Sequence, residues 1–213
     1  MILMMILYPA KRKKNYIQVN LEGEFIGIIP QKIIPLDYSL QTEITCSEEF
    51  IHQVKEWVYN QAQNLLLDFL AKAERCVFDC KMFLHKNEIP NQVIKQVLAL
   101  AEKKKWLSDD RYTERYIQEA ICRGKSHREI MFKLSQKHID TSLIRQYLTQ
   151  EYNQVTQQEI IAQIIDKLLP GLKDLESHQK FEKIATVLHR KGFIYHDYEK
   201  LLQMKINMEG ENF

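Results

Sequence analysis

The sequence predicts a mainly α-helical protein built from three tandem three-helix repeats behind a small N-terminal β-hairpin element. The main observation is a set of five apolar positions, which begins at Cys80 and recurs fifty and then fifty-four residues later. The three sets are Cys80, Leu84, Ile89, Ile94, Leu98; Ile130, Leu134, Ile139, Ile144, Leu148; and Ile184, Leu188, Phe193, Tyr198, Leu202. Spacings of four, five, five and four residues indicate a helix, a short turn and a second helix with helix-turn-helix character.

None of the three predicted units is large enough to bury its apolar face alone. We therefore expect them to stack into an elongated, curved array with a shared core, which needs no dimer for stability, so a monomer is expected. The predicted boundaries are 1–46 for the β element, 47–106, 107–153 and 154–207 for the repeats, and 208–213 for a tail.

The first 45 residues have the signals of β structure. The apolar run 1–8 is too short to span a bilayer and is predicted to be a buried strand, so no membrane partner is expected. Apolar and polar residues alternate over 16–21, and Glu22-Gly23 supplies a turn into a second strand that Pro30 ends. Ser47 is a predicted helix N-cap, and the pattern is helical from there on.

Helix start and stop signals are clearest in the middle repeat. Ser108 precedes a helix whose first residues, Asp109 and Asp110, are favourably placed in the field of the helix dipole. Gly124 ends that helix, and Ser126 opens the next one with a capping-box pattern. The apolar face of the first helix is predicted to be Tyr112, Tyr116, Ile117, Ala120 and Ile121. In the first repeat, Pro90 occupies a predicted first-turn position.

Composition and spacing do not indicate an enzyme. Cys76, Cys80 and His85 could suggest a metal site, but no CxxC pair is present and Cys80 falls in an apolar column, so a core thiol is expected. The helix-start position of Asp109 and Asp110 explains them without catalysis, and neither a nucleophile triad nor a phosphate-binding glycine loop is recognisable. No metal or cofactor is expected, and the cysteine spacing favours reduced thiols in the cytoplasm.

Charge is distributed unevenly along the chain. The net charge is only +2, but residues 101–150 carry eleven Lys or Arg against seven Asp or Glu. The basic residues of the middle repeat are Arg123, Lys125, Arg128, Lys133 and Lys137. The last three lie outside the apolar columns and should be exposed, where they form either a solvated helix face or a binding surface for phosphate or an acidic protein.

The segment 106–112, Trp-Leu-Ser-Asp-Asp-Arg-Tyr, resembles a signature of the RecX family of recombination regulators. The signature residues here are Leu107, Asp109, Asp110 and Tyr112, and we expect them to be structural. The resemblance continues through 123–126 and upstream at Glu74-Arg75. It also includes the segment 188–193, whose Arg190 and Lys191 we add to the predicted binding surface.

What this resemblance implies is a negative modulator of RecA. Such a protein would bind the RecA–DNA filament, contact more than one protomer, and inhibit the recombinase, ATPase and co-protease activities of RecA. DNA would be a weak second partner, either single-stranded or within the filament. Two alternatives remain open from the sequence: a helix-turn-helix-like protein that binds nucleic acid without RecA, and a structural adaptor that binds neither.

Overall fold

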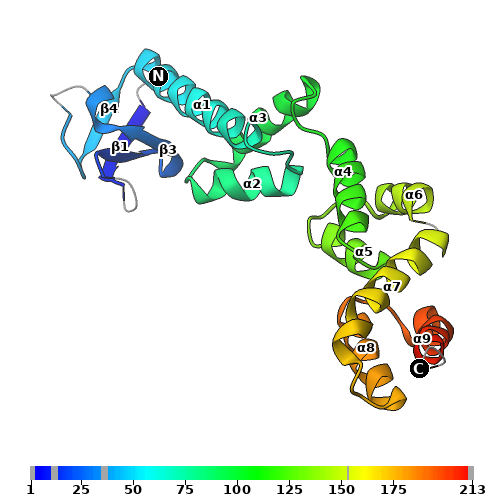
Figure 1. The fold of residues 1–213 in the computed structure, drawn as a ribbon. Helices are drawn as coiled ribbons and strands as arrows, with labels where there is room; N and C mark the ends of the chain where they lie inside the picture. The colour runs from blue at the N-terminus through cyan, green and yellow to red at the C-terminus, as the bar shows by residue number, and fades with distance from the viewer. Residues whose placement is uncertain (1–2, 11–13, 35–37, 153, 211–213) are drawn as a thin grey trace. The chain divides into compact units, whose positions relative to one another are not determined.

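The structure is a computed structural model that describes residues 3–10, 14–34, 38–152 and 154–210 (Figure 1). It consists of two compact units, 1–108 and 109–213. The first unit holds a sheet and three helices, and the second holds the remaining helices. The described residues are mainly helical, as the sequence predicts.

A four-stranded antiparallel sheet forms the start of the first unit. Its strands are β1 (Leu3–Pro9), β2 (Tyr16–Leu21), β3 (Glu24–Pro30) and β4 (Glu43–Cys46), in the order β3-β2-β1-β4. A short 3₁₀ turn, Gln31–Ile33, follows β3. The sequence predicted β1 to β3 but described them as a hairpin element. It missed β4 because that strand has only four residues, and a polar stretch precedes it.

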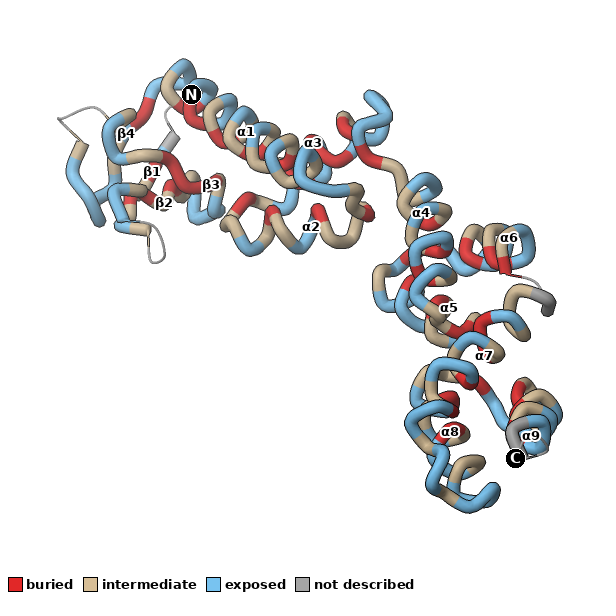
Figure 2. The backbone as a smooth tube through the Cα atoms, in the orientation of Figure 1, coloured by how far each residue is buried: buried red, intermediate tan, exposed pale blue. Residues whose placement is uncertain are grey.

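The sheet packs on the first helix, α1 (Glu48–Leu70), through alternate residues of its strands (Figure 2). The buried residues include Met5 and Leu7 of β1 and Ile17 and Val19 of β2. Successive side chains of a strand point to opposite faces of the sheet, so every second residue faces the helix. Gly27 of β3 has φ of 144°, and a Cβ placed there would lie 2.5 Å from Val58 Cγ2 of α1. Glycine is therefore the residue that lets β3 approach the helix this closely.

The N-terminus of α1 is capped as predicted, because the Phe50 N–H donates to Ser47 Oγ at 3.2 Å. The buried face of α1 contributes to two hydrophobic cores. Ile51, Val54 and Val58 pack under the sheet, and Ala62 and Leu66 pack against α2 (Val77–Lys86) and α3 (Asn91–Lys103). Pro90 is the N-cap of α3, one position before the predicted first turn.

The second unit contains the helices α4 (Asp109–Cys122), α5 (His127–Ser135), α6 (Thr141–Glu151), α7 (Gln154–Leu168), α8 (Ser177–Arg190) and α9 (Tyr195–Gly210), with a 3₁₀ turn at Leu169–Leu172. Ser126 caps α5, since its Oγ accepts from the Glu129 N–H at 3.1 Å. Asp140 caps α6 by accepting from the N–H groups of Ser142 and Leu143. A hydrogen bond from the Ser142 hydroxyl, together with these two backbone hydrogen bonds, lowers the pKa of the Asp140 carboxyl group.

All fifteen residues of the three apolar columns are buried (Figure 2). The turns that follow α2, α5 and α8 also share a left-handed residue at the corresponding position. These are Glu88 (φ 59°), His138 (φ 56°) and Gly192 (φ 85°). A common core pattern and a common turn geometry therefore recur in α2–α3, α5–α6 and α8–α9.

Two predicted details differ from the structure. On α4 the buried residues are Thr113, Ile117 and Ala120, whereas Tyr112 and Tyr116 are half-buried. Thr113 is tolerated in the core because its hydroxyl donates to the Asp109 carbonyl oxygen at 2.6 Å. At the C-terminus, α9 extends to Gly210, so the first residues of the predicted tail are helical. Residues 211–213 lie outside the described part.

Gly192→Ala should destabilise the protein by about 2–4 kcal/mol, because alanine is strained at positive φ and its Cβ would lie 2.5 Å from Ser126 Oγ. Gly171→Ala is the matched control, since a Cβ at Gly171 meets nothing within 4 Å. Urea denaturation followed by circular dichroism measures both. Equal stability of the two variants would contradict the packing described here.

Candidate partner-binding surface

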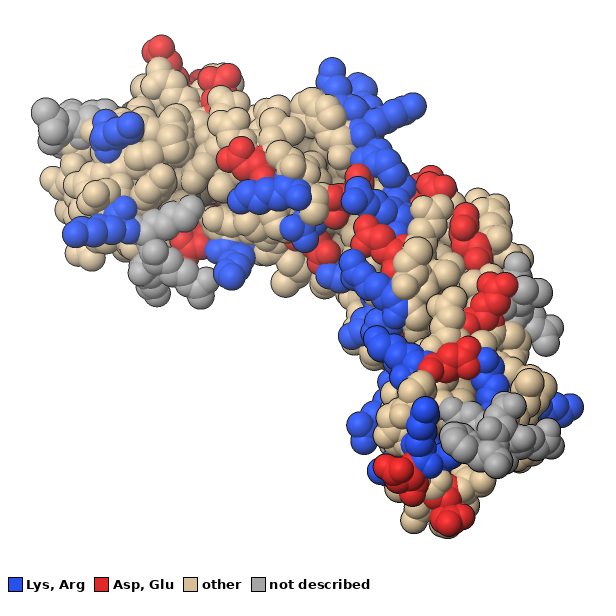
Figure 3. Space-filling model, in the orientation of Figure 1, with Lys and Arg blue, Asp and Glu red and all other residues tan. Residues whose placement is uncertain are grey.

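The predicted basic residues of the middle repeat lie at the end of α4, along α5 and in the turns beside them. We call the group around α5 the α5 surface and define it as Arg123, Lys125, Arg128, Phe132, Lys133 and Lys137. Figure 3 shows lysine and arginine side chains gathered over this part of the second unit, with acidic side chains among them. The surface is therefore mixed in charge, and its individual ion pairs decide which cations a partner can reach.

Two of the predicted cations are already paired with carboxylates of the same unit. Lys125 Nζ lies 2.6 Å from Glu129 Oε1, and Arg123 Nη2 lies 3.2 Å from Glu119 Oε2. The Glu119 carboxylate also accepts from Arg115 at 3.0 Å. Such exposed pairs contribute about 0–1 kcal/mol to stability each. Their main effect here is to neutralise part of the positive charge.

Arg128 and Lys133 are the two cations best placed for a partner. Both are exposed on α5. Within the described part of the chain, no carboxylate lies at ion-pair distance from either side chain. The prediction of exposure is confirmed for these two residues, but Lys137, in the turn after α5, is half-buried.

Phe132 is a member of this surface that sequence reasoning missed. Its side chain lies on α5 between Arg128 and Lys133 in sequence, is 58% exposed, and has Lys133 Nζ 5.8 Å from its ring centroid. The sequence feature that could have identified Phe132 is an aromatic residue at a helical position just outside the apolar columns. Met82, fifty residues earlier on α2, is 50% exposed. Exposed aromatic and methionine side chains are enriched in protein interfaces.

The phenol of Tyr116 on α4 lies near several of these charged side chains. Burial raises the pKa of its phenol and the Glu129 carboxylate adds to the increase, while Lys125, Lys137 and Arg123 act in the opposite direction. The phenol therefore stays neutral at pH 7 and lies among the charged groups of both α4 and the α5 region. Three of the basic residues of the middle repeat, Arg123, Lys125 and Lys137, therefore act on one phenol.

The turn between α8 and α9 lies against the start of α5. Gly192 in that turn packs on Ser126, the N-cap of α5. Arg190 is the exposed last residue of α8, and Lys191 follows it as the C-cap. The fold thus brings the two separately predicted basic segments, 123–137 and 190–191, to the same junction of the second unit.

The four residues of the signature segment have structural contacts. Leu107 is buried in the helical core of the first unit. Asp109 starts α4 and its carbonyl oxygen binds Thr113, whereas the Asp110 carboxylate accepts from the Tyr147 hydroxyl of α6 at 3.0 Å. The Tyr112 ring stacks on Tyr116 with centroids 6.0 Å apart. The contact between Asp110 and Tyr147 joins α4 to α6, and α4 ends at Cys122, just before Arg123.

The described residues hold no group of three or more His, Cys, Asp or Glu side chains that could bind a metal ion. Cys76 and Cys80 are buried, and Cys80 belongs to the core between α1, α2 and α3. No helix among the described residues has the length and apolar character needed to cross a membrane.

No protein-family model matches the chain. The regulatory protein RecX of Streptococcus sanguinis is 28% identical over 214 residues, which cover 98% of this chain and 80% of that protein. RecX of Oceanobacillus iheyensis is 26% identical and covers 86% of this chain. A crystal structure of regulatory protein RecX superposes with a TM-score of 0.63 at 21% identity, over 93% of this chain and 98% of the other. The chain is similar to RecX regulatory proteins over nearly its whole length.

A second RecX structure, from Lactobacillus salivarius, matches 71% of this chain with a TM-score of 0.62. At 21% identity both structures support the fold, namely a mainly helical protein with a small N-terminal antiparallel sheet. The RecX relatives are named as regulatory proteins rather than as enzymes. The resemblance found in the sequence is thus confirmed over nearly the whole chain.

Phe132→Ala should change the free energy of unfolding by less than about 0.5 kcal/mol, because the ring is mostly in water. Its neighbour in the core provides the contrast. Leu134→Ala should cost about 2–5 kcal/mol, since Leu134 is fully buried. Urea titrations of the two variants measure this difference, and a large loss for Phe132→Ala would show that the ring belongs to the core.

Proposed function

We propose that this protein regulates RecA by binding the RecA–DNA filament, and that it inhibits the recombinase, ATPase and co-protease activities of RecA. Similarity to RecX regulatory proteins over most of the chain supports a regulatory role. The observation that carries the residue-level proposal is the combination on α5 of an exposed aromatic ring, Phe132, with two unpaired cations, Arg128 and Lys133. No cofactor is required, and the protein acts in the cytoplasm as a monomer.

The α5 surface suits an acidic protein surface better than a continuous phosphate track. A nucleic-acid track needs a row of available cations, whereas here Glu119 and Glu129 neutralise Arg123 and Lys125. An aromatic side chain with a charged rim is typical of the centre of a protein interface. We therefore assign Phe132 as the anchor on RecA, with Arg128 and Lys133 facing carboxylates. Contact with filament DNA is secondary.

The three helix triplets act as tandem repeats that contact neighbouring RecA protomers. Met82 on α2 corresponds to Phe132 on α5, fifty residues apart, so two repeats expose a large apolar side chain at the same position. A filament presents identical subunits in succession, and each repeat can engage one of them. Binding at a second subunit becomes intramolecular once the first is bound, which raises the overall affinity without any strong single contact.

The charge reversal Arg128→Glu with Lys133→Glu should raise the concentration needed for half-inhibition of the RecA ATPase on single-stranded DNA by about tenfold or more. Reversal replaces two attractions to carboxylates by two repulsions. Lys167→Glu with Lys200→Glu is the matched control, because it makes the same charge change at exposed positions of α7 and α9. The control should inhibit like the original protein.

Unchanged inhibition by the Arg128 and Lys133 variant would rule out the α5 surface as the RecA contact. Absence of inhibition by the original protein, together with tight binding to naked DNA that weakens steeply with salt, would instead favour the nucleic-acid-binding alternative. If the original protein did neither, the adaptor alternative would remain. The ATPase titration and a DNA-binding titration at two salt concentrations therefore separate the three functions.

A further inference from the structure

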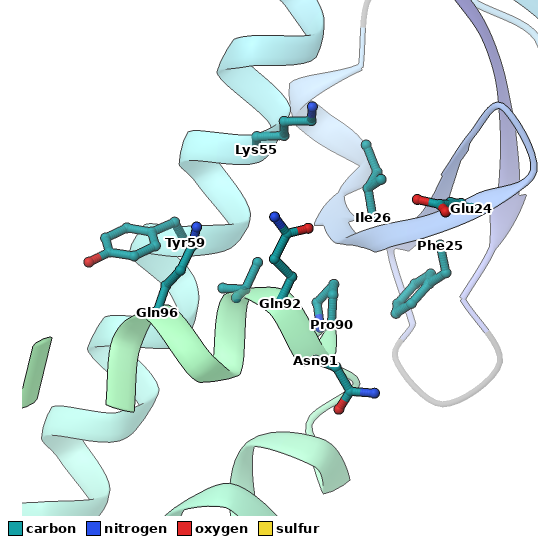
Figure 4. Close-up of a pocket in the computed structure, with 10 residues that line it drawn as sticks. Glu24, Phe25, Ile26, Lys55, Tyr59, Pro90, Asn91, Gln92 and Gln96 are labelled. Carbon is teal, nitrogen blue, oxygen red and sulfur yellow. The ribbon is translucent and has the colours of Figure 1, made fainter. Parts of the chain in front are cut away.

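Two hollows of the first unit differ in the charge of the residues that line them. The first, of about 610 Å³, lies between β3, α1 and α3, and both Glu24 and Lys55 line it, so its charge selects no occupant (Figure 4). The second, of about 1010 Å³, lies where the segment before β2 and the turn after β3 approach α1. We call it the Trp57 hollow. Its lining includes Lys14, Asn15, Tyr16, Gln31, Lys32 and Trp57, and no Asp or Glu is among the described residues that line it.

A backbone hydrogen bond joins the two segments that carry the lysines of this hollow. The Gln31 N–H donates to the Asn15 carbonyl oxygen at 2.9 Å, one residue beyond the last β2–β3 pair. Lys14 precedes Asn15 and Lys32 follows Gln31, so the two lysines flank one bonded pair. Both are exposed, and neither has a carboxylate at ion-pair distance in the described part of the chain. Like charges across neighbouring segments repel each other, and a bound anion would relieve this repulsion.

The α1 wall of the hollow adds an aromatic ring without negative charge beside it. Trp57 is half-buried against the core under the sheet and also lines the hollow. Residues three and four positions away on a helix share one face, and for Trp57 these are Gln53, Val54, Asn60 and Gln61. Glu56 is rotated by about 100° from Trp57 around the helix axis. Its carboxylate lies 4.0 Å from His52 Nε2, on a different face of α1.

Two cations and an aromatic ring, in a lining without carboxylates, match the chemistry of a single-stranded nucleic acid. Each nucleotide of such a strand offers a phosphate to a lysine and a flat base to the ring of a tryptophan, whatever its sequence. A base inside a duplex is stacked on both faces and cannot reach a protein ring without being flipped out. An acidic peptide would satisfy the lysines, but its carboxylates offer no flat group to Trp57.

The sequence around Lys14 agrees with such a partner. Lys14 is the last of four consecutive cations, which begin at Lys11. Short runs rich in Lys and Arg are typical of segments that bind nucleic acid. Of this run, Lys14 lies within the described residues, and the site is built on Lys14 and not on the other three.

We propose that the Trp57 hollow binds single-stranded nucleic acid, with one base stacked on Trp57 and neighbouring phosphates on Lys14 and Lys32. Binding is weak and independent of base sequence, because it uses few cations and no contacts to base edges. The hollow shares no residue with the α5 surface. The site therefore goes beyond the function proposed above and does not rest on it, since it binds a strand whether or not RecA is present.

Fluorescence tests the stacking directly, because the chain has two tryptophans, Trp57 and Trp106. In the full chain with Trp106→Phe, a short oligothymidylate should quench the emission of Trp57 as a base stacks on its ring. The matched control is Trp57→Phe, in which Trp106 is the reporter and should show little quenching. A blunt duplex and thymidine monophosphate, at equal nucleotide concentration, should quench Trp57 much less. The duplex hides its bases, and the monophosphate offers a single phosphate.

Salt dependence tests the two lysines. In the Trp106→Phe chain, Lys14→Gln with Lys32→Gln should weaken oligothymidylate binding about tenfold at low salt. It should also reduce the slope of log affinity against log salt by about 1.4, the value for two phosphate contacts on a single strand. Lys55→Gln with Lys95→Gln is the matched control, because both residues are exposed in the first unit and neither lines the Trp57 hollow. This control should keep the original slope.

Quenching of Trp106 in place of Trp57 would overturn the proposal, and so would equal slopes for the two pairs of lysine variants. Equal quenching by thymidine monophosphate would reveal a site for free nucleotides, and equal quenching by the duplex a site for phosphate alone. Either result would also contradict it. No RecA is present in these titrations, so their failure leaves the RecA proposal untouched.

Discussion

Burial of the apolar columns is the constraint on which the helical part of this protein depends. The helices that carry the columns are short, from nine residues in α5 to sixteen in α9, and helices of this length are marginal in water by themselves. They persist because residues such as Leu84, Leu134 and Leu188 find apolar partners on neighbouring helices. The turns are then restricted as well, since the chain must reverse within a few residues, which the left-handed conformation of Glu88, His138 and Gly192 allows.

The same constraint explains why a binding surface can form on α5. Ile130 and Leu134 fix one face of this nine-residue helix in the core, so Phe132 and Lys133 between them are held in water. Phe132 and Lys133 are therefore presented on a short, rigid element rather than on a loop. A surface positioned in this way loses little conformational entropy when a partner binds, which favours affinity from few contacts.

The sequence predicted the helical class, the columns, the strands β1 to β3 and the basic segments, because these depend on periodicity and on local turn chemistry. It could not predict which cations would be paired. Glu119 and Glu129 neutralise Arg123 and Lys125 through side-chain geometry that composition does not reveal. It also missed Phe132. In the sequence, Phe132 cannot be told from an apolar residue of the helical core, and only the structure shows that its ring lies largely in water.

The shared use of α1 has a consequence for how the first unit responds to damage. One end of this 23-residue helix is covered by the sheet and the other by α2 and α3, and both cores lie on one continuous helix. Removal of the sheet would expose Ile51, Val54 and Val58 as an apolar stripe along α1, while the rest of the helix stayed packed. Proteolytic removal of the N-terminal strands would therefore yield an aggregation-prone fragment rather than a smaller functional protein. Cellular chaperones and proteases would recognise this fragment by its exposed apolar stripe.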